Sequence, residues 1–161
     1  MNLKRLLKKE MMYPEIHFTS QEQLFEFVGN ELGRAGYVTP TYKEKISERE
    51  KSFPTGLRTK TVDVAIPHTD PETVKRAFIM VMKLTEGIPF NQMGTFPEDA
   101  VIVYPKLVFV LGFDHGDIQL ELLQGLMTLF NNQLAMKKLL EATCAEQLLN
   151  ILEQELVLIA K

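Results

Sequence analysis

The chain has 161 residues, of which 45% are hydrophobic and 24% are charged, and its formal net charge is -3. These values are typical of one soluble globular domain and exclude a disordered tail, a collagen-like rod and a disulfide-dense miniprotein. The basic surplus of a nucleic-acid-binding protein is missing, and no apolar run approaches the roughly 18–20 residues of a membrane-spanning helix. The single cysteine, Cys144, cannot form an internal disulfide. We therefore expect a slightly acidic, cytoplasmic, one-domain protein.

Residues 1–13 differ in composition from the rest and are treated as a basic amino-terminal segment ahead of a domain over residues 14–161. Basic side chains surround Leu3, Leu6 and Leu7, but the segment lacks the apolar run and the cleavage site of a secretory signal. A short amphipathic helix on a membrane surface is one interpretation. We favour the other, a solvated start to a helix or a frayed end.

Elements of alternating type follow in chain order. Capping-box patterns predict three helix starts, and strands are predicted from short runs rich in Val, Ile and Phe. The expected elements are an extended segment at 14–18, helices at 20–35 and 41–51, strands at 62–66, 77–84 and 107–112, turns with a short segment at 87–104, and helices from 117, at 134–141 and at 145–160. The sequence therefore predicts an α/β single domain with a central mixed β-sheet flanked by helices on both faces.

His68 has the most suggestive context of the three histidines. It follows a predicted strand and Pro67, and Asp70 and Pro71 are favoured residues for the start of a helix. His68 should thus lie at the carboxyl end of a strand and ahead of a helix amino terminus, where anions bind. A neutral imidazole in such a place is a suitable nucleophile for phosphoryl transfer. From these local residues alone, however, a histidine that caps the strand or hydrogen-bonds its loop is the favoured interpretation.

A second motif changes that balance. Ala65-Ile66-Pro67-His68, together with Glu-Arg-Glu-Lys-Ser-Phe-Pro-Thr-Gly at 48–56, resembles the enzyme IIA domain of the bacterial phosphoenolpyruvate:sugar phosphotransferase system, in its fructose–mannitol type. Within that family the pair of motifs is most similar to the galactitol-specific IIA proteins. The resemblance extends over roughly residues 20–153 and implies the type-2 enzyme IIA fold.

The resemblance also implies a function. In this family the small phosphocarrier protein HPr donates a phosphoryl group to a histidine of enzyme IIA. The group then moves to a cysteine of enzyme IIB and on to a sugar that crosses the membrane through enzyme IIC. His68 matches the carrier histidine, and Arg49 matches the arginine of the site, whose planar cationic group suits phosphoryl oxygens. No cofactor or metal is implied.

The chain departs from the family pattern at Gln119, which takes the place of a second site histidine in the mannitol-type branch. An amide can hydrogen-bond His68 or a phosphoryl oxygen but cannot take up a proton. Thr69 and His115 are possible supporting residues, whereas His17, outside both motifs, is expected to be structural.

Two alternatives to a transport carrier stay open. A regulatory IIA-like protein, signalling through His68 phosphorylation, would have the same carrier histidine. A metal-dependent hydrolase using His68 and Asp70 belongs to a different class, but no spacing in the sequence fixes a metal geometry for it. Cys144, at a predicted helix start, is expected to be partly buried.

Overall fold

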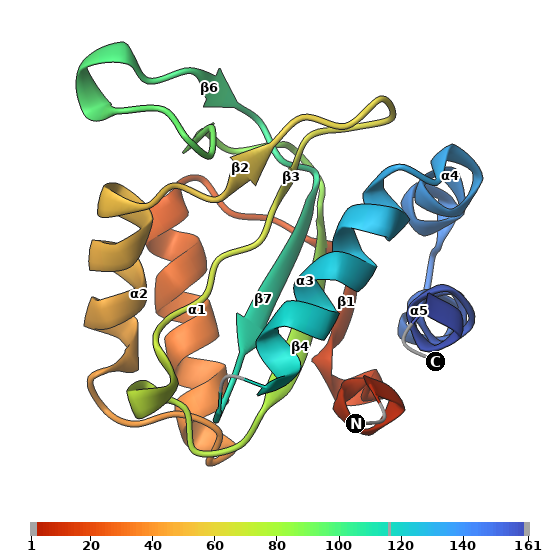
Figure 1. Cartoon of the computed structure of the whole chain (residues 1–161), viewed down its shortest axis with the longest axis horizontal. Coiled ribbons are helices and arrows are strands. Elements are labelled where there is room, and N and C mark those ends of the chain that lie inside the picture. Colours follow the sequence, from red (N-terminus) through yellow and green to blue (C-terminus); the bar gives the residue numbers. More distant parts are fainter. Residues whose placement is uncertain (1–2, 116, 160–161) are drawn as a thin grey trace.

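A central β-sheet lies between two sets of helices in the computed structural model, which describes residues 3–115 and 117–159 (Figure 1). The elements in chain order are the short 3₁₀ helices η1 (Leu3–Leu6) and η2 (Lys9–Met11), β1 (Met12–Ile16), α1 (Gln21–Arg34), α2 (Tyr42–Ser52), β2 (Gly56–Leu57), β3 (Val64–Ala65), η3 (Pro71–Thr73), β4 (Phe78–Leu84), β5 (Phe90–Asn91), η4 (Pro97–Asp99), β6 (Ile102–Val103), β7 (Leu107–Gly112), α3 (Asp117–Phe130), α4 (Gln133–Glu141) and α5 (Ala145–Ile159).

The main sheet is mixed, with strand order β1-β4-β7-β3-β2. β1 runs parallel to β4 and β3 parallel to β7, whereas the β4–β7 and β2–β3 pairs are antiparallel. The two long central strands are apolar throughout apart from one lysine and one glycine, as expected of strands buried on both faces. This architecture confirms the predicted fold class.

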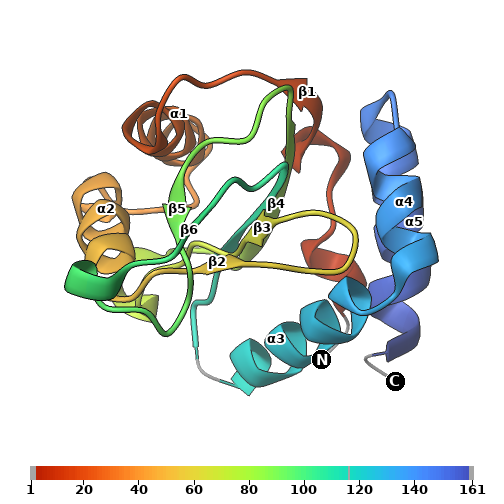
Figure 2. The same cartoon turned by 90° about the horizontal axis from the view of Figure 1, so that it is seen from above.

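Two hydrophobic cores fill the spaces on either side of the sheet. Successive residues of β4 alternate between them: Ile79 and Val81 join the core under α3, α4 and α5, while Met80 and Met82 join the core under α1 and α2. Figures 1 and 2 show α1 and α2 on one side of the sheet and α3–α5 on the other. No described helix is long and apolar enough to cross a membrane.

The predicted helix starts agree with the structure in place but only partly in mechanism. The Gln23 backbone N–H donates to the Ser20 hydroxyl at 3.1 Å, as a capping box requires. Thr41 makes no such side-chain cap, and the Thr143 N–H donates to Gln147, one residue beyond the predicted glutamate. The local sequence pattern therefore predicted where each of these helices begins, but not which side chain forms its capping hydrogen bond.

The prediction of a solvated or frayed amino terminus is wrong. Leu3, Leu6 and Leu7 are buried in the core under α3–α5, and β1 begins at Met12, two residues before the predicted start of the domain at residue 14. The basic side chains do face outward, with Lys4 3.9 Å from the carboxylate of Glu153. The segment is amphipathic, but its apolar face is covered by α5.

The helix expected after Asp70 and Pro71 is also absent; one 3₁₀ turn, η3, stands there. Val74 already forms a β-bridge with Val38, and β4 begins at Phe78, so the chain has no length left for an α-helix. His68 therefore lacks the helix amino terminus that the sequence predicts beside it.

Candidate functional site

His68 is attached to the sheet by its backbone. It lies three residues beyond β3 and forms a parallel β-bridge with Leu111 of β7, whose N–H donates to the Pro67 carbonyl at 3.0 Å. The predicted position at the carboxyl end of a strand is therefore confirmed. The ring is half-buried, and its edge meets the ring of Phe113 at a centroid distance of 6.0 Å.

One hydrogen bond defines which ring nitrogen of His68 is reactive. Nδ1 lies 2.8 Å from the carbonyl oxygen of Ile66. Because a carbonyl can only accept, Nδ1 must carry the proton, and in the neutral ring the lone pair is then on Nε2. The backbone of the strand end thus selects the tautomer in which Nε2 is the nucleophile.

The surroundings of His68 also keep its ring neutral. Burial lowers the pKa of His68 below its ordinary value, and the positive charge of Arg49 acts in the same direction. The hydrogen bond to Ile66 and the charge of Asp70 oppose this shift without cancelling it. At neutral pH the Nε2 lone pair is therefore available.

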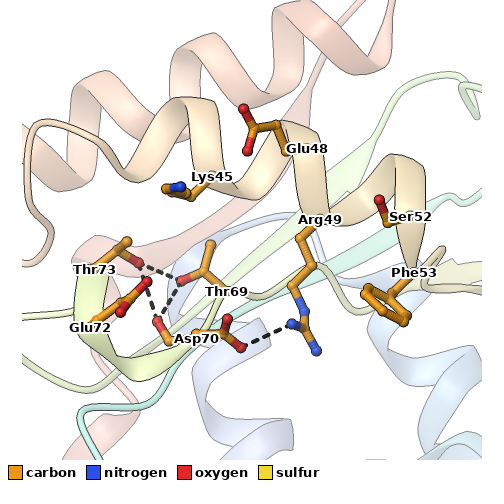
Figure 3. A pocket seen from close by; sticks show the side chains of 9 residues that line it. All are labelled: Lys45, Glu48, Arg49, Ser52, Phe53, Thr69, Asp70, Glu72 and Thr73. Carbon is orange, nitrogen blue, oxygen red and sulfur yellow. Dashed lines mark hydrogen bonds and ion pairs between the residues drawn. The ribbon is translucent and has the colours of Figure 1, made fainter.

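Arg49 reaches the same region from α2. Its Nη1 donates to Oδ1 of Asp70 at 2.9 Å, and its guanidinium lies 5.3 Å from the ring centre of Phe53 (Figure 3). Its Nε is buried with no hydrogen-bond partner among the described residues. Because the pair with Asp70 is largely exposed, it adds little to stability. The guanidinium is held in place with donors still free for an anion.

A cavity of about 260 Å³ separates α2 from the segment that follows His68. His68 itself is not part of its wall. Figure 3 shows Arg49 crossing the cavity toward Asp70. The lining residues are Lys45, Glu48, Arg49, Ser52, Phe53, Thr69, Asp70, Glu72 and Thr73.

Beside Arg49, Glu50 holds the end of α2 to the start of β2. Its buried carboxylate accepts the Thr55 N–H at 2.7 Å and the Thr55 hydroxyl at 2.8 Å. Burial raises the pKa of Glu50 to about 7, although both hydrogen bonds pull it down. This pair of hydrogen bonds, called the Glu50–Thr55 clasp below, was not predicted from the sequence. Both residues belong to the motif at 48–56, and their spacing could have indicated the contact.

The remaining candidate residues are Thr69, Gln119 and His115. Thr69 is buried, and its hydroxyl is 2.7 Å from that of Thr73, which ties the turn after His68 together. Gln119 is half-buried in the first turn of α3, and no hydrogen bond joins it to His68 in the described part of the chain. His115 is exposed, with Nε2 3.5 Å from the Asp114 carboxylate.

Two residues outside the site contrast with each other. His17 bonds the Thr85 hydroxyl through Nδ1 at 3.0 Å and links the ends of β1 and β4, in agreement with a structural role. Cys144 is exposed, so the expectation of partial burial is wrong. Among the described side chains, no group of three His, Cys, Asp or Glu residues could hold a metal ion.

Comparison with known proteins indicates the family to which the chain belongs. The family model "Phosphoenolpyruvate-dependent sugar phosphotransferase system, EIIA 2" matches residues 5–155. A galactitol-specific EIIA component from Escherichia coli is 30% identical over 111 residues, which are 69% of this chain and 71% of that protein. The match covers nearly the whole described chain.

Solved structures share the fold. The nitrogen regulatory protein IIA-Ntr from Neisseria meningitidis is 25% identical, with a TM-score of 0.75 over 93% of this chain and 98% of that one. The mannitol enzyme IIA of Escherichia coli, solved in complex with phosphorylated enzyme IIB, is 23% identical, with a TM-score of 0.71 over 92% and 97%.

The fold is thus that of the enzyme IIA domains of phosphotransferase systems. The chain belongs to the EIIA 2 family of the phosphoenolpyruvate-dependent sugar phosphotransferase system.

Proposed function

We propose that this protein is a phosphocarrier that accepts a phosphoryl group on Nε2 of His68. The observation that carries the proposal is the 2.8 Å hydrogen bond from Nδ1 to the Ile66 carbonyl, which leaves Nε2 as the nucleophilic nitrogen. Arg49 supports it, because a permanent cation beside the ring matches the charge of the incoming group.

The transfer consists of two displacements. In the first, the Nε2 lone pair attacks phosphorus while the P–N bond of phospho-HPr breaks and its electron pair returns to the HPr imidazole. In the second, a cysteine thiolate of a IIB component attacks, and the electron pair of the bond to Nε2 returns to His68. Arg49 stabilises the phosphoryl oxygens in both directions.

The relatives support the proposed partners and substrate. HPr is the proposed donor, a IIB cysteine the proposed acceptor, and a IIC permease the indirect recipient, in a relay on the cytoplasmic side. The mannitol relative was solved with phosphorylated IIB, which favours the acceptor. The galactitol-specific relative favours galactitol or a related sugar alcohol.

Three further residues complete the proposed site. Thr69 fixes the turn after His68, and Gln119 supplies an amide in place of the second family histidine. His115 is a possible further contact from the loop before α3. We expect Gln119→His to keep at least partial function, because imidazole can replace the amide as a hydrogen-bond donor.

Labelled phosphoenolpyruvate with enzyme I and HPr tests the carrier role. We expect acid-labile, alkali-stable label on the wild type, none on His68→Ala or His68→Gln, and slower labelling of Arg49→Ala. His17→Ala is the matched control and should label normally, since the His17 ring bonds Thr85 and contacts no proposed site residue in the described part of the chain. Undiminished labelling of His68→Ala would exclude the proposal.

A regulatory protein is the second candidate, favoured by the likeness to the Neisseria nitrogen regulatory protein. It would carry the same phosphohistidine but would not pass the group to a sugar. Mixing the labelled protein with a galactitol-type IIB separates the two, because a carrier transfers its label to the IIB cysteine and a regulator retains it.

A further inference from the structure

A strip of exposed apolar side chains lies beyond β2, on and around the β5–β6 hairpin. Most of the exposed large apolar side chains of the described chain are here, with exposed fractions from 38% to 67%. Such a concentration marks an interaction surface more often than chance. The side chains of this strip, called the hairpin strip below, are Met93, Phe96, Val101, Ile102 and Tyr104.

The base of the β5–β6 hairpin, which carries the hairpin strip, contacts the rest of the molecule. Phe90 and Val103, the inward-facing residues of β5 and β6, are buried in the core under α1 and α2. The Met93 N–H donates to the carbonyl of Gly56 at 2.7 Å, which ties the hairpin to β2. The base of the hairpin is therefore anchored both to the core and to β2.

The two ends of the strip carry opposite charges. Glu98 and Asp99 lie in η4 near the hairpin tip, while Arg58 and Lys60 lie on the loop between β2 and β3. All four are exposed, and none forms an ion pair with a described residue. Figures 1 and 2 both place the hairpin tip and the β2–β3 loop tip at opposite ends of this side of the molecule.

We propose that the hairpin strip binds the same strip of a second copy of this chain about a two-fold axis. In such an interface each patch meets itself in reversed direction, so the basic end of one copy falls on the acidic end of the other. An apolar centre with unlike charges at its ends is complementary to itself in this arrangement. The apolar side chains supply most of the affinity, and the charged ends fix the orientation.

The hairpin strip is separate from the cavity of the proposed phosphoryl site. None of its five residues lines that cavity. The proposal does not depend on His68 being phosphorylated, and its outcome is read from association alone.

Sedimentation velocity of the full chain from about 1 µM to about 1 mM tests the proposal. We expect a reversible monomer–dimer equilibrium, weakened at least about tenfold by Ile102→Asp, which buries a charge in the strip. Thermal unfolding of this variant shows that it is folded. A chain that stays monomeric over the whole range overturns the proposal.

Charge reversal tests the orientation. Arg58→Glu with Lys60→Glu makes both ends acidic, and Glu98→Lys with Asp99→Lys makes both ends basic, so each double variant should dimerise more weakly than the wild type. A mixture of the two should form heterodimers at least as readily as the wild type forms dimers.

The control for charge reversal is Lys137→Glu with Lys138→Glu on the exposed face of α4, which should not change association. A dimer that ignores both reversals in the strip, or that responds equally to the α4 control, refutes the proposed interface.

Discussion

Replacing Glu50 with glutamine is expected to flatten the pH dependence of stability between pH 4.5 and about 7, the ordinary and the raised pKa of this carboxyl group. In the folded protein Glu50 is buried and clasps Thr55 through both carboxylate oxygens. An amide keeps both contacts, because its oxygen accepts from the backbone N–H and its NH₂ group donates to the hydroxyl oxygen. The substitution therefore removes the charge and leaves the clasp.

The sign of the effect follows from proton binding. Between the two pKa values the unfolded chain has lost the Glu50 proton while the folded chain retains it, so stability falls as pH rises. The difference between 4.5 and about 7 corresponds to about 3 kcal/mol. Glu50→Gln should match the wild type near pH 4.5 and exceed its stability by up to about 3 kcal/mol above pH 7.

Urea unfolding at a series of pH values from about 5 to about 8 measures this difference. Glu48→Gln, an exposed neighbour on the same helix, is the matched control and should leave the pH dependence unchanged. If Glu50→Gln is less stable than the wild type at every pH, the carboxylate is required by the clasp and the reasoning fails.

Three further substitutions have expected outcomes. Arg49→Ala should move the acid limb of the pH–rate profile for His68 labelling to higher pH, because the charge of Arg49 lowers the pKa of the ring. A profile whose acid limb does not move contradicts this. Leu3→Ala should lower the free energy of unfolding in urea by roughly 2–5 kcal/mol, whereas Lys9→Ala, at an exposed position, should lower it by less than about 0.5 kcal/mol. Equally small losses for both variants would mean that the amino-terminal segment is not packed. Gly56→Ala should lower stability by about 1–3 kcal/mol, since its Cβ would come within 2.6 Å of the β5–β6 hairpin, and a wild-type melting curve would argue against that close approach.

Much of the fold was predictable because its long elements carry their own pattern. β7 was predicted with its observed bounds, and the helix predicted over residues 20–35 is α1. The two-residue strands β2, β5 and β6 were not, since a pairing over two residues is too short to carry an alternating pattern. The bridge between Gly56 and Gln92 joins segments more than thirty residues apart in the sequence, and local pattern cannot indicate such a contact.

The site was predictable in part for a similar reason. His68 and Arg49 are carried by motifs, and the structure brings both to one region. The charge pattern of residues 1–12 wrongly predicted a solvated segment. The sequence of this segment could not indicate its burial, because α5, which covers it, lies more than a hundred residues further along the chain. Good capping residues predicted a helix after Asp70, but the few residues before β4 leave room only for the 3₁₀ turn η3.

The bridge between the His68 segment and β7 makes a single amide hydrogen a reporter of the site. The Leu111 N–H is held by the Pro67 carbonyl, one residue before the histidine, inside the strand that joins the two cores. That hydrogen can exchange with solvent only when the histidine segment separates from β7. The exchange rate of the Leu111 amide hydrogen therefore measures how often the His68 segment opens away from β7.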